Sequence, residues 1–298
     1  MSIILVNPPS LYHMPKFRAE GKLAYFELSR RQVGENGFWS LPGEHLGLGS
    51  LAAACADRGI AVHIVNGQVL FHRSVEQTWQ AITRAAARHG SPDVIGFTGP
   101  AQVFAENLHL AGLVKRRWPG CVTVLGHDFA TLNHERVLDE HTEFDVVACG
   151  EAEDCFVELC LAVLDDRWPE PVPGMARRGE PFQPAQVLDI DQLPWPIRAD
   201  LPLVMAAGLS PAVFTSRGCP YRCTYCTTGA TASLLAGARR HREKSLDNVL
   251  AEIQDLAGRH RIRHLTITDD LFLSKSPESR ERATDFARRL IAARLDLT

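Results

Sequence analysis

Three cysteines, Cys219, Cys223 and Cys226, lie within eight residues at CxxxCxxC spacing, directly after the strand-like run 212–215. Thiolates are the usual protein ligands of iron–sulfur clusters, and closely spaced cysteines on one loop can bind several corners of one cluster. Three cysteines on a four-iron cluster leave one iron without a protein ligand, as in metal sites that carry out catalysis. The spacing therefore predicts a catalytic 4Fe–4S site.

Two other interpretations of the motif remain open. A zinc site would need a fourth ligand, for which His241 is the candidate nearby, and the three thiols could also be ordinary buried side chains. The N-terminal residues are not expected to form a signal peptide, so the eight cysteines favour reduced thiols and metal ligation over disulfides. The other five are expected to be buried, apolar side chains; they are Cys55, Cys121, Cys149, Cys155 and Cys160.

The motif resembles that of the radical S-adenosylmethionine (SAM) superfamily, because an aromatic residue, Tyr225, precedes the last cysteine. The flanking residues 215–221, TSRGCPY, look like the branch with an N-terminal cobalamin-binding domain. The resemblance implies that the three cysteines hold the cluster and that SAM chelates its free iron, with Tyr225 beside these cofactors. It also implies an electron donor such as flavodoxin or ferredoxin.

Residues 1–165 alternate strand-like and helix-like segments. Strands are expected at 3–7, 61–66, 93–99, 121–126 and 145–150, and helices at 48–58, 76–89, 102–117, 134–141 and 151–164. This alternation predicts an α/β fold with a doubly wound, flavodoxin-like parallel sheet. Ligands of such sheets bind beyond the carboxyl ends of the strands, at the switch point of the strand order.

The loops at that edge resemble the cobalamin-binding domain of the same family. The expected cofactor-binding residues are Asn7, Pro8, Leu46, Gly47, Thr98, Gly99, Gly126, His127, Thr131, Gly150 and Glu151. No DxHxxG motif is present, and Phe129 stands where relatives often place a histidine. Either cobalt has no protein ligand or the domain has lost the cofactor, and a sheet that binds nothing is the remaining alternative.

Two segments lack this alternation. Residues 10–45 form a long insert whose Tyr25, Phe38 and Trp39 could cover the cofactor, although a plain surface excursion is as good an explanation. Residues 166–204 are rich in proline and are expected to form an extended, semi-stiff linker.

Residues 205–298 are expected to begin a partial (β/α) barrel of the radical SAM type. The expected elements are strands at 212–215 and 264–268 and helices at 246–260, capped by Ser245, and 278–294. Barrel geometry places the cysteine loop beside Asp269 and Asp270, which follow the second strand. The resemblance implies that these carboxylates contact the SAM ammonium, while capping of the last helix is the alternative for Asp270.

Composition limits the possible functions. The chain has 298 residues, 45% hydrophobic and 22% charged, as in a soluble protein with two cores. No apolar run approaches the ~18 residues of a membrane span, so a cytoplasmic protein without membrane contact is expected. Residues 205–298 hold 15 Lys and Arg against 10 Asp and Glu, including Arg239, Arg240, Arg242 and Lys244. We expect these four in a solvated loop; an anionic substrate or RNA is the alternative, and nucleic-acid binding has no other support.

Taken with the motif, the resemblance implies a cobalamin-dependent radical SAM methyltransferase that acts on a small metabolite. It also implies a barrel of six βα units, of which the sequence holds two, so a truncated chain with loosely packed last ~90 residues and no turnover is expected. The alternatives are another radical SAM reaction (cyclisation, ring formation or methylthiolation) and a non-catalytic, truncated cofactor-binding protein.

Overall fold

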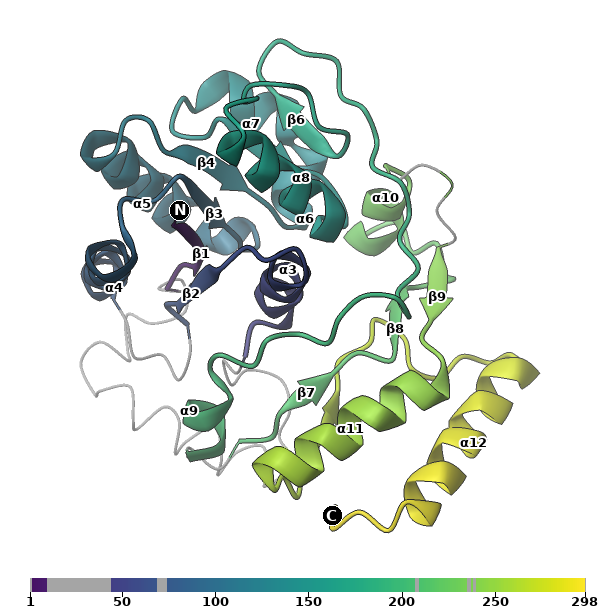
Figure 1. The fold of residues 1–298 in the computed structure, drawn as a ribbon. Coiled ribbons are helices and arrows are strands. Elements are labelled where there is room, and N and C mark those ends of the chain that lie inside the picture. The colour runs from purple at the N-terminus through teal and green to yellow at the C-terminus, as the bar shows by residue number, and fades with distance from the viewer. Residues whose placement is uncertain are drawn as a thin grey trace, which may run out of the picture.

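The structure is a computed structural model that describes residues 2–9, 44–68, 74–206, 209–234, 237 and 240–297. Figure 1 shows two halves, with an α/β sandwich at the N-terminal side and a smaller group of strands and helices at the C-terminal side. The insert residues Tyr25, Phe38 and Trp39, and also Arg239, lie outside the described residues.

A six-stranded sheet forms the centre of the first half. Its strands are β1 (Ile3–Asn7), β2 (Val62–Asn66), β3 (Val94–Phe97), β4 (Val122–Leu125), β5 (Val146–Ala148) and β6 (Met175–Arg177). The order is β2-β1-β3-β4-β5-β6, and only β6 runs antiparallel to its neighbour. The flavodoxin-like order of the first five strands is therefore confirmed.

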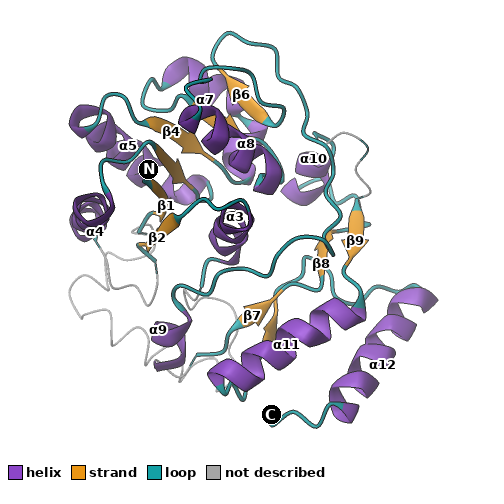
Figure 2. Ribbon diagram, in the orientation of Figure 1, coloured by secondary structure: helices purple, strands orange, loops and turns teal. Residues whose placement is uncertain are grey.

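Helices cover both faces of this sheet (Figure 2). One face carries α3 (Leu46–Asp57) and α8 (Glu153–Leu164); the other carries α4 (Val75–His89), α5 (Phe104–Arg117) and α7 (His134–Glu140). The short elements η2 (Ala101–Val103) and α6 (Asp128–Leu132) follow β3 and β4. Along β1, Ile4 and Val6 pack into one core and Ile3 and Leu5 into the other, because successive side chains of a strand point to opposite faces.

The five cysteines outside the motif are buried, as predicted. Cys55 of α3 and Cys160 of α8 meet where these two helices pack against each other. Burial raises the pKa of Cys121, Cys149 and Cys155 to about 12, so these thiols stay protonated and apolar.

The proline-rich segment is more ordered than an extended linker. It supplies the edge strand β6 and the short helix α9 (Leu201–Ala206), neither of which was predicted. It also contacts both halves, because the Ile197 amide donates to Gly49 O at 3.0 Å and Trp195 Nε1 donates to Asn248 Oδ1 at 3.0 Å. The side chain of Arg198 lies between Glu44 and Glu252, one from each half.

The second half contains two small sheets. The parallel pair is β7 (Ala212–Val213) with β10 (Thr266–Ile267), and the antiparallel pair is β8 (Ser216–Gly218) with β9 (His241–Glu243). The helices are α10 (Thr227–Ala232), α11 (Leu246–His260) and α12 (Pro277–Ala292). Ser245 caps α11 as predicted.

A separate core fills this half. Val213, Val249, Ile253, Leu256 and Phe286 are buried in it. The expectation of loose packing is therefore wrong for the inner side of this half; outside it, Leu273 and Ile291 are 53% and 77% exposed. None of the helices formed by the described residues is long and apolar enough to cross a bilayer.

Candidate functional site

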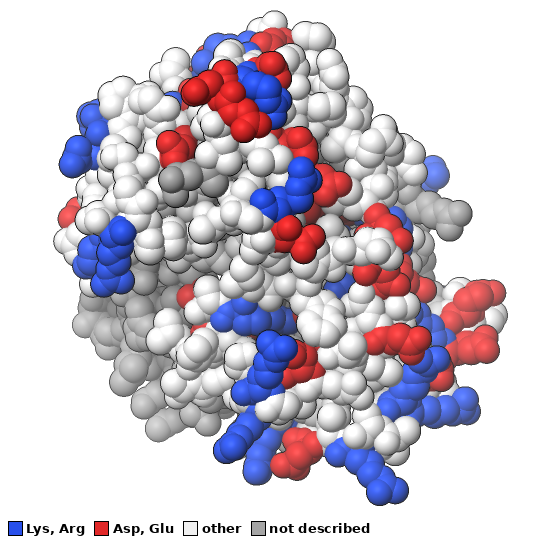
Figure 3. Space-filling view, viewed as in Figure 1, with Lys and Arg blue, Asp and Glu red and all other residues white. Residues whose placement is uncertain are grey.

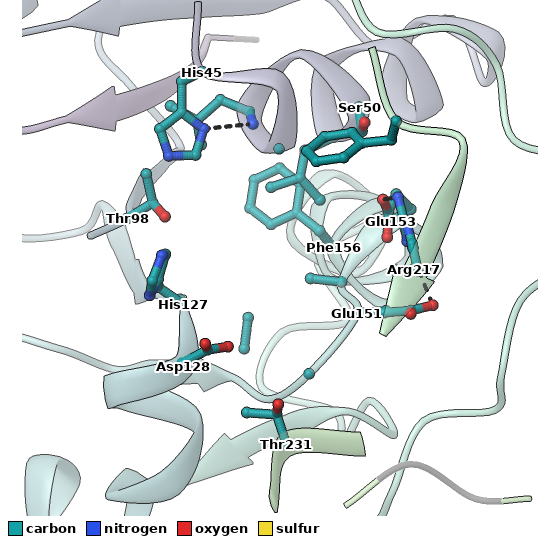
Figure 4. A pocket seen from close by; sticks show the side chains of 18 of the residues that line it. His45, Ser50, Thr98, His127, Asp128, Glu151, Glu153, Phe156, Arg217 and Thr231 are labelled. Carbon is teal, nitrogen blue, oxygen red and sulfur yellow. Dashed lines mark hydrogen bonds and ion pairs between the residues drawn. The ribbon is translucent and has the colours of Figure 1, made fainter. Parts of the chain in front are cut away.

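A cavity of about 390 Å³ lies where the carboxyl ends of the central strands face the second half of the chain (Figure 4). Gly47, Thr98, Gly126, His127 and Gly150 line it from the first half. Its other lining residues include Phe214, Ser216, Arg217, Gly218, Arg240, Arg242 and Asp270 from the second half. The switch point of the sheet therefore opens directly onto the segment that leads into the cysteine loop.

The structure divides the residues predicted to bind cofactors into two groups. Those that line the cavity are Gly47, Thr98, Gly126, His127, Gly150, Glu151 and Asp270; those that do not are Asn7, Pro8, Leu46, Gly99, Thr131, Tyr225 and Asp269. Asn7 instead bonds Asn66 of the neighbouring strand at 2.9 Å, and Thr131 Oγ1 accepts from the Gly150 amide at 3.1 Å. These two residues shape the edge of the sheet without facing the cavity.

Gly126 leaves room for a ligand at the end of β4. A Cβ atom at this position would meet nothing nearer than 3.9 Å, and it would point between Ala148 and Phe97. The space at the switch point is therefore open because the residue has no side chain, as a large planar cofactor would require.

Two histidines, His45 and His127, face the cavity from the first half (Figure 4). His45 Nδ1 accepts the Leu48 amide at 3.1 Å at the start of α3, so the neutral ring carries its proton on Nε2. Burial, followed by the neighbouring His127, lowers the pKa of His45 to about 4. His45 therefore presents a neutral N–H donor, and it was missed because it ends the unpatterned insert.

Phe129, which stands where relatives often place a histidine, does not face the cavity. Its ring packs against Phe104 at a centroid distance of 5.0 Å, in the core beneath α6. The histidine that this loop presents to the cavity is His127, whose backbone has φ 87°. The short helix α6 was not predicted, and it turns Phe129 inward.

An ion-pair network connects the two halves at the cavity wall. Arg217 of β8 pairs with Glu153, the first residue of α8, and Arg242 of β9 pairs with Glu151. Burial alone would raise the pKa of Glu153, but the charge and hydrogen bond of Arg217 lower it below its usual value. The predicted solvated loop is therefore wrong for Arg242 and also for Lys244, which pairs with Glu252 at 3.3 Å.

The predicted pair of aspartates is split. Asp269 accepts hydrogen bonds from the Thr215 amide at 2.7 Å and the Ser216 amide at 3.1 Å, so its carboxylate ties β10 to the start of the cysteine segment. Asp270 lines the cavity, and burial together with the charge of Asp128 raises its pKa. It does not cap the last helix, because Ser276 caps α12.

The cysteine loop follows β8 directly. Cys219 is partly buried, Cys223 and Cys226 are exposed, and none of them is in a disulfide. Within the described ranges, no three His, Cys, Asp or Glu side chains converge closely enough to hold a metal ion, with or without His241. The donor set itself, three soft thiols on one loop, suits an iron–sulfur cluster.

Two buried polar atoms next to this loop suit a polar ligand. Ser216 Oγ and His241 Nε2 have no hydrogen-bond partner among the described residues. Ser216 lines the cavity and His241 does not. Buried polar atoms are normally satisfied, so the unsatisfied Ser216 Oγ indicates where a molecule in the cavity would donate or accept.

The two halves match two families. The family model for the B12 binding domain matches residues 40–160, and that for the radical SAM superfamily matches residues 213–294. An uncharacterized methyltransferase from Pyrococcus horikoshii, PH0819, is 28% identical over 216 residues, which cover 70% of this chain and 45% of the relative. The cobalamin-dependent radical SAM methyltransferase TokK of Streptomyces tokunonensis is 31% identical over 200 residues, which cover 61% of this chain and 28% of the relative.

Among solved structures, the radical SAM methyltransferase TsrM from Kitasatospora setae, with cobalamin and a 4Fe–4S cluster bound, has the same fold. The TM-score is 0.66 at 19% identity, and the match covers 99% of this chain and 52% of TsrM. The chain thus spans about half or less of the length of the proteins it matches.

The family matches show that a B12-binding domain precedes a radical SAM domain in this chain. The chain is homologous to cobalamin-dependent radical SAM methyltransferases such as TokK. The family resemblance seen in the cysteine motif is confirmed.

Proposed function

We propose that this protein is a cobalamin-dependent radical SAM methyltransferase that methylates an unactivated centre of a small molecule. One observation carries the proposal: a single cavity is bounded both by the switch point of the B12-binding sheet and by the residues that flank the cysteine loop. The two cofactors of such a reaction would meet in that cavity, with no protein layer between them. We assign residues 1–165 to the cobalamin domain, 166–204 to the connection and 205–298 to the radical SAM domain.

When bound, the cofactors would supply the chemistry, with radical generation from SAM at the cluster and a transferable methyl group on cobalamin. The protein supplies ligands and placement. Cys219, Cys223 and Cys226 are the cluster ligands in this proposal. Asp270, which lines the cavity, is the acceptor for the SAM ammonium.

The cobalamin side is formed by small and neutral groups. Gly126 leaves space at the end of β4, Gly150 lines the cavity after β5, and Thr98 and the neutral His45 offer hydrogen-bonding groups. Walls such as Leu5, Phe97 and Phe156 exclude water from this side.

The substrate class follows from the relatives. A homologue from Streptantibioticus cattleyicolor, 30% identical over 172 residues, is a 2-(S-pantetheinyl)-carbapenam-3-carboxylate methyltransferase, and TsrM has been solved with tryptophan. Both are small molecules, so we propose a small-molecule substrate here. An electron donor such as flavodoxin or ferredoxin would reduce the cluster through the exposed side of the loop, where Cys223 and Cys226 lie.

Anaerobic incubation with SAM labelled in its methyl group tests the function. In a protein with a complete barrel, the expected result is release of 5′-deoxyadenosine together with label on the bound cobalamin and on product. Release of 5′-deoxyadenosine without any methyl transfer would establish a different radical reaction. Protein that retains cobalamin but releases no 5′-deoxyadenosine would establish the non-catalytic alternative, and protein that retains neither iron nor cobalamin would refute the proposal.

A further inference from the structure

The cysteine loop is attached to the B12-binding half at both of its ends. Two residues before Cys219, Arg217 pairs with Glu153. Directly after Cys226, Thr227 Oγ1 donates to Asp128 Oδ2 at 2.9 Å. Asp128 and Glu153 are the first residues of α6 and α8, the helices that follow β4 and β5, and both line the cavity.

The contact before the loop is the stronger of the two. Arg217 Nη1 also lies 3.4 Å from Glu151 Oε2, so one guanidinium contacts two carboxylates, one just before α8 and one at its first residue. The side chain of Glu153 is 7% exposed and that of Arg217 is 24% exposed. Figure 4 shows the two side chains next to each other. Removal of one partner of such a largely buried pair strongly destabilises the fold, because the other charge is left buried without a partner.

The register of the antiparallel pair β8–β9 explains why Glu151 and Glu153 are needed. Arg217 of β8 stands opposite Arg242 of β9, and like charges at opposite positions of an antiparallel pair repel each other. Glu151 pairs with both arginines and Glu153 with one of them. The pairing of β8 with β9, on either side of the cysteine loop, therefore depends on Glu151 and Glu153 of the other half.

The backbone next to Arg217 allows little freedom. Gly218 has φ 78°, and a Cβ atom there would lie 2.0 Å from Arg240 O. One residue before Cys219, the backbone of β8 thus lies directly against Arg240, the residue that precedes β9. A displacement of Arg217 would therefore also displace the cysteine loop, because Gly218 between Arg217 and Cys219 has little room to move.

We propose that the Glu153–Arg217 pair and the Asp128–Thr227 bond are positioning contacts that fix the cysteine loop, and hence its cluster, at one distance from cobalamin. This inference rests on the proposed function, because it assumes that both cofactors are bound. None of the four residues is given a chemical step. Glu153 and Arg217 carry most of the effect, because the Asp128–Thr227 bond is exposed.

Amide hydrogen exchange of the cofactor-free protein tests the contact. In Glu153→Gln, exchange of residues 216–218 and 241–243 should be about tenfold faster than in the wild type, through local opening. The Glu153→Gln/Arg217→Gln double variant should be no worse than the more affected single variant, because the two residues act as a pair. The control is Arg58→Gln, which removes an exposed pair with Glu158 at 3.5 Å and should change nothing. Unchanged exchange in Glu153→Gln, or additive effects in the double variant, would overturn the contact.

Pulsed dipolar EPR of the reconstituted protein, between cob(II)alamin and the reduced cluster, tests the positioning. The wild type and Arg58→Gln should give one narrow distance distribution. Glu153→Gln and Arg217→Lys should keep their iron and cobalamin but give a broader or shifted distribution, and Thr227→Val a smaller change of the same kind. An unchanged distribution in loaded Glu153→Gln would refute the inference while the proposed function stood. If the wild type bound no cofactor, the function would fail, and the exchange data would still decide whether the contact orders the loop.

Discussion

Asp269 and Asp270 are adjacent in sequence at the end of β10, yet their carboxylates serve different neighbours. Asp269 accepts from the amides of Thr215 and Ser216 and crosslinks the backbone at the base of the cysteine segment. Asp270 lines the cavity instead. A structural residue and a candidate ligand-binding residue thus lie side by side, and substitution separates them.

Asp269→Asn should lower the free energy of unfolding by about 2–3 kcal/mol, because hydrogen bonds to a charged acceptor are lost. Asp270→Asn should leave unfolding unchanged but weaken SAM binding at least tenfold, since an amide attracts an ammonium less than a carboxylate does. Denaturant titration and calorimetric SAM titration of both variants check the two effects. The assignment is wrong if Asp270→Asn destabilises the fold or if Asp269→Asn weakens SAM binding without any loss of stability.

The stability of the first half should depend on the protonation of His45. Its pKa is lowered to about 4 in the folded protein, so its contribution is complete above the unfolded value near 6.5 and is lost as the pH falls from there towards 4. The loss should be about 2–3 kcal/mol. His45→Asn keeps a side-chain acceptor for the Leu48 amide but cannot titrate, so it should flatten this part of the curve. Unfolding titrations between pH 7 and pH 4 measure it; identical curves would show that His45 does not titrate as described.

The three motif cysteines should be the only protein ligands of the cluster. Replacing Cys223 by Ala should abolish the iron-dependent absorbance after anaerobic reconstitution, and so should the corresponding changes at Cys219 and Cys226. Cys121→Ala is the matched control, because this thiol is buried in the other half and should leave about four irons bound. Zinc in protein purified without oxygen, with Cys223 as a ligand, would contradict the cluster.

Cobalt should have no imidazole ligand from the protein. His45 uses Nδ1 as an acceptor and carries its proton on Nε2, and the chain lacks the DxHxxG histidine. The EPR spectrum of bound cob(II)alamin should therefore show no nitrogen splitting from a histidine. Splitting that disappears in His127→Ala would identify His127 as the ligand and disprove the prediction.

Much of the fold could be predicted because its elements carry local signals. β1 and α11 were predicted with their observed bounds, because a buried β-branched run and a capped amphipathic helix can be recognised from a short stretch of sequence. The strands β6, β8 and β9 were missed. Each is only three residues long, too short for a periodic pattern, and each forms by pairing with a segment distant in sequence.

The site shows the same division. The spacing of the cysteines predicts ligation of an iron–sulfur cluster, but nothing in the sequence connects Arg217 with Glu153, 64 residues away. Likewise, the pattern match at Thr131 and Asn7 did not show that these side chains bond to Gly150 and Asn66 and do not line the cavity. Figure 3 shows acidic and basic side chains interspersed on the visible face of the second half. From the sequence, the excess of basic residues in 205–298 had suggested a solvated basic loop.

Cobalamin binding by two glycine variants tests the central claim, that the cavity at the switch point holds this cofactor beside the cysteine loop. Gly126 lines the cavity, and a Cβ atom there would lie no nearer than 3.9 Å to a protein atom; Gly120 lies in an open turn with no atom within 4 Å of its Cβ position. Both leucine variants should fold like the wild type. The account predicts that Gly126→Leu weakens equilibrium binding of cobalamin about 100-fold or more, because its side chain fills the site, while Gly120→Leu binds like the wild type. Wild-type affinity in a correctly folded Gly126→Leu protein would contradict it.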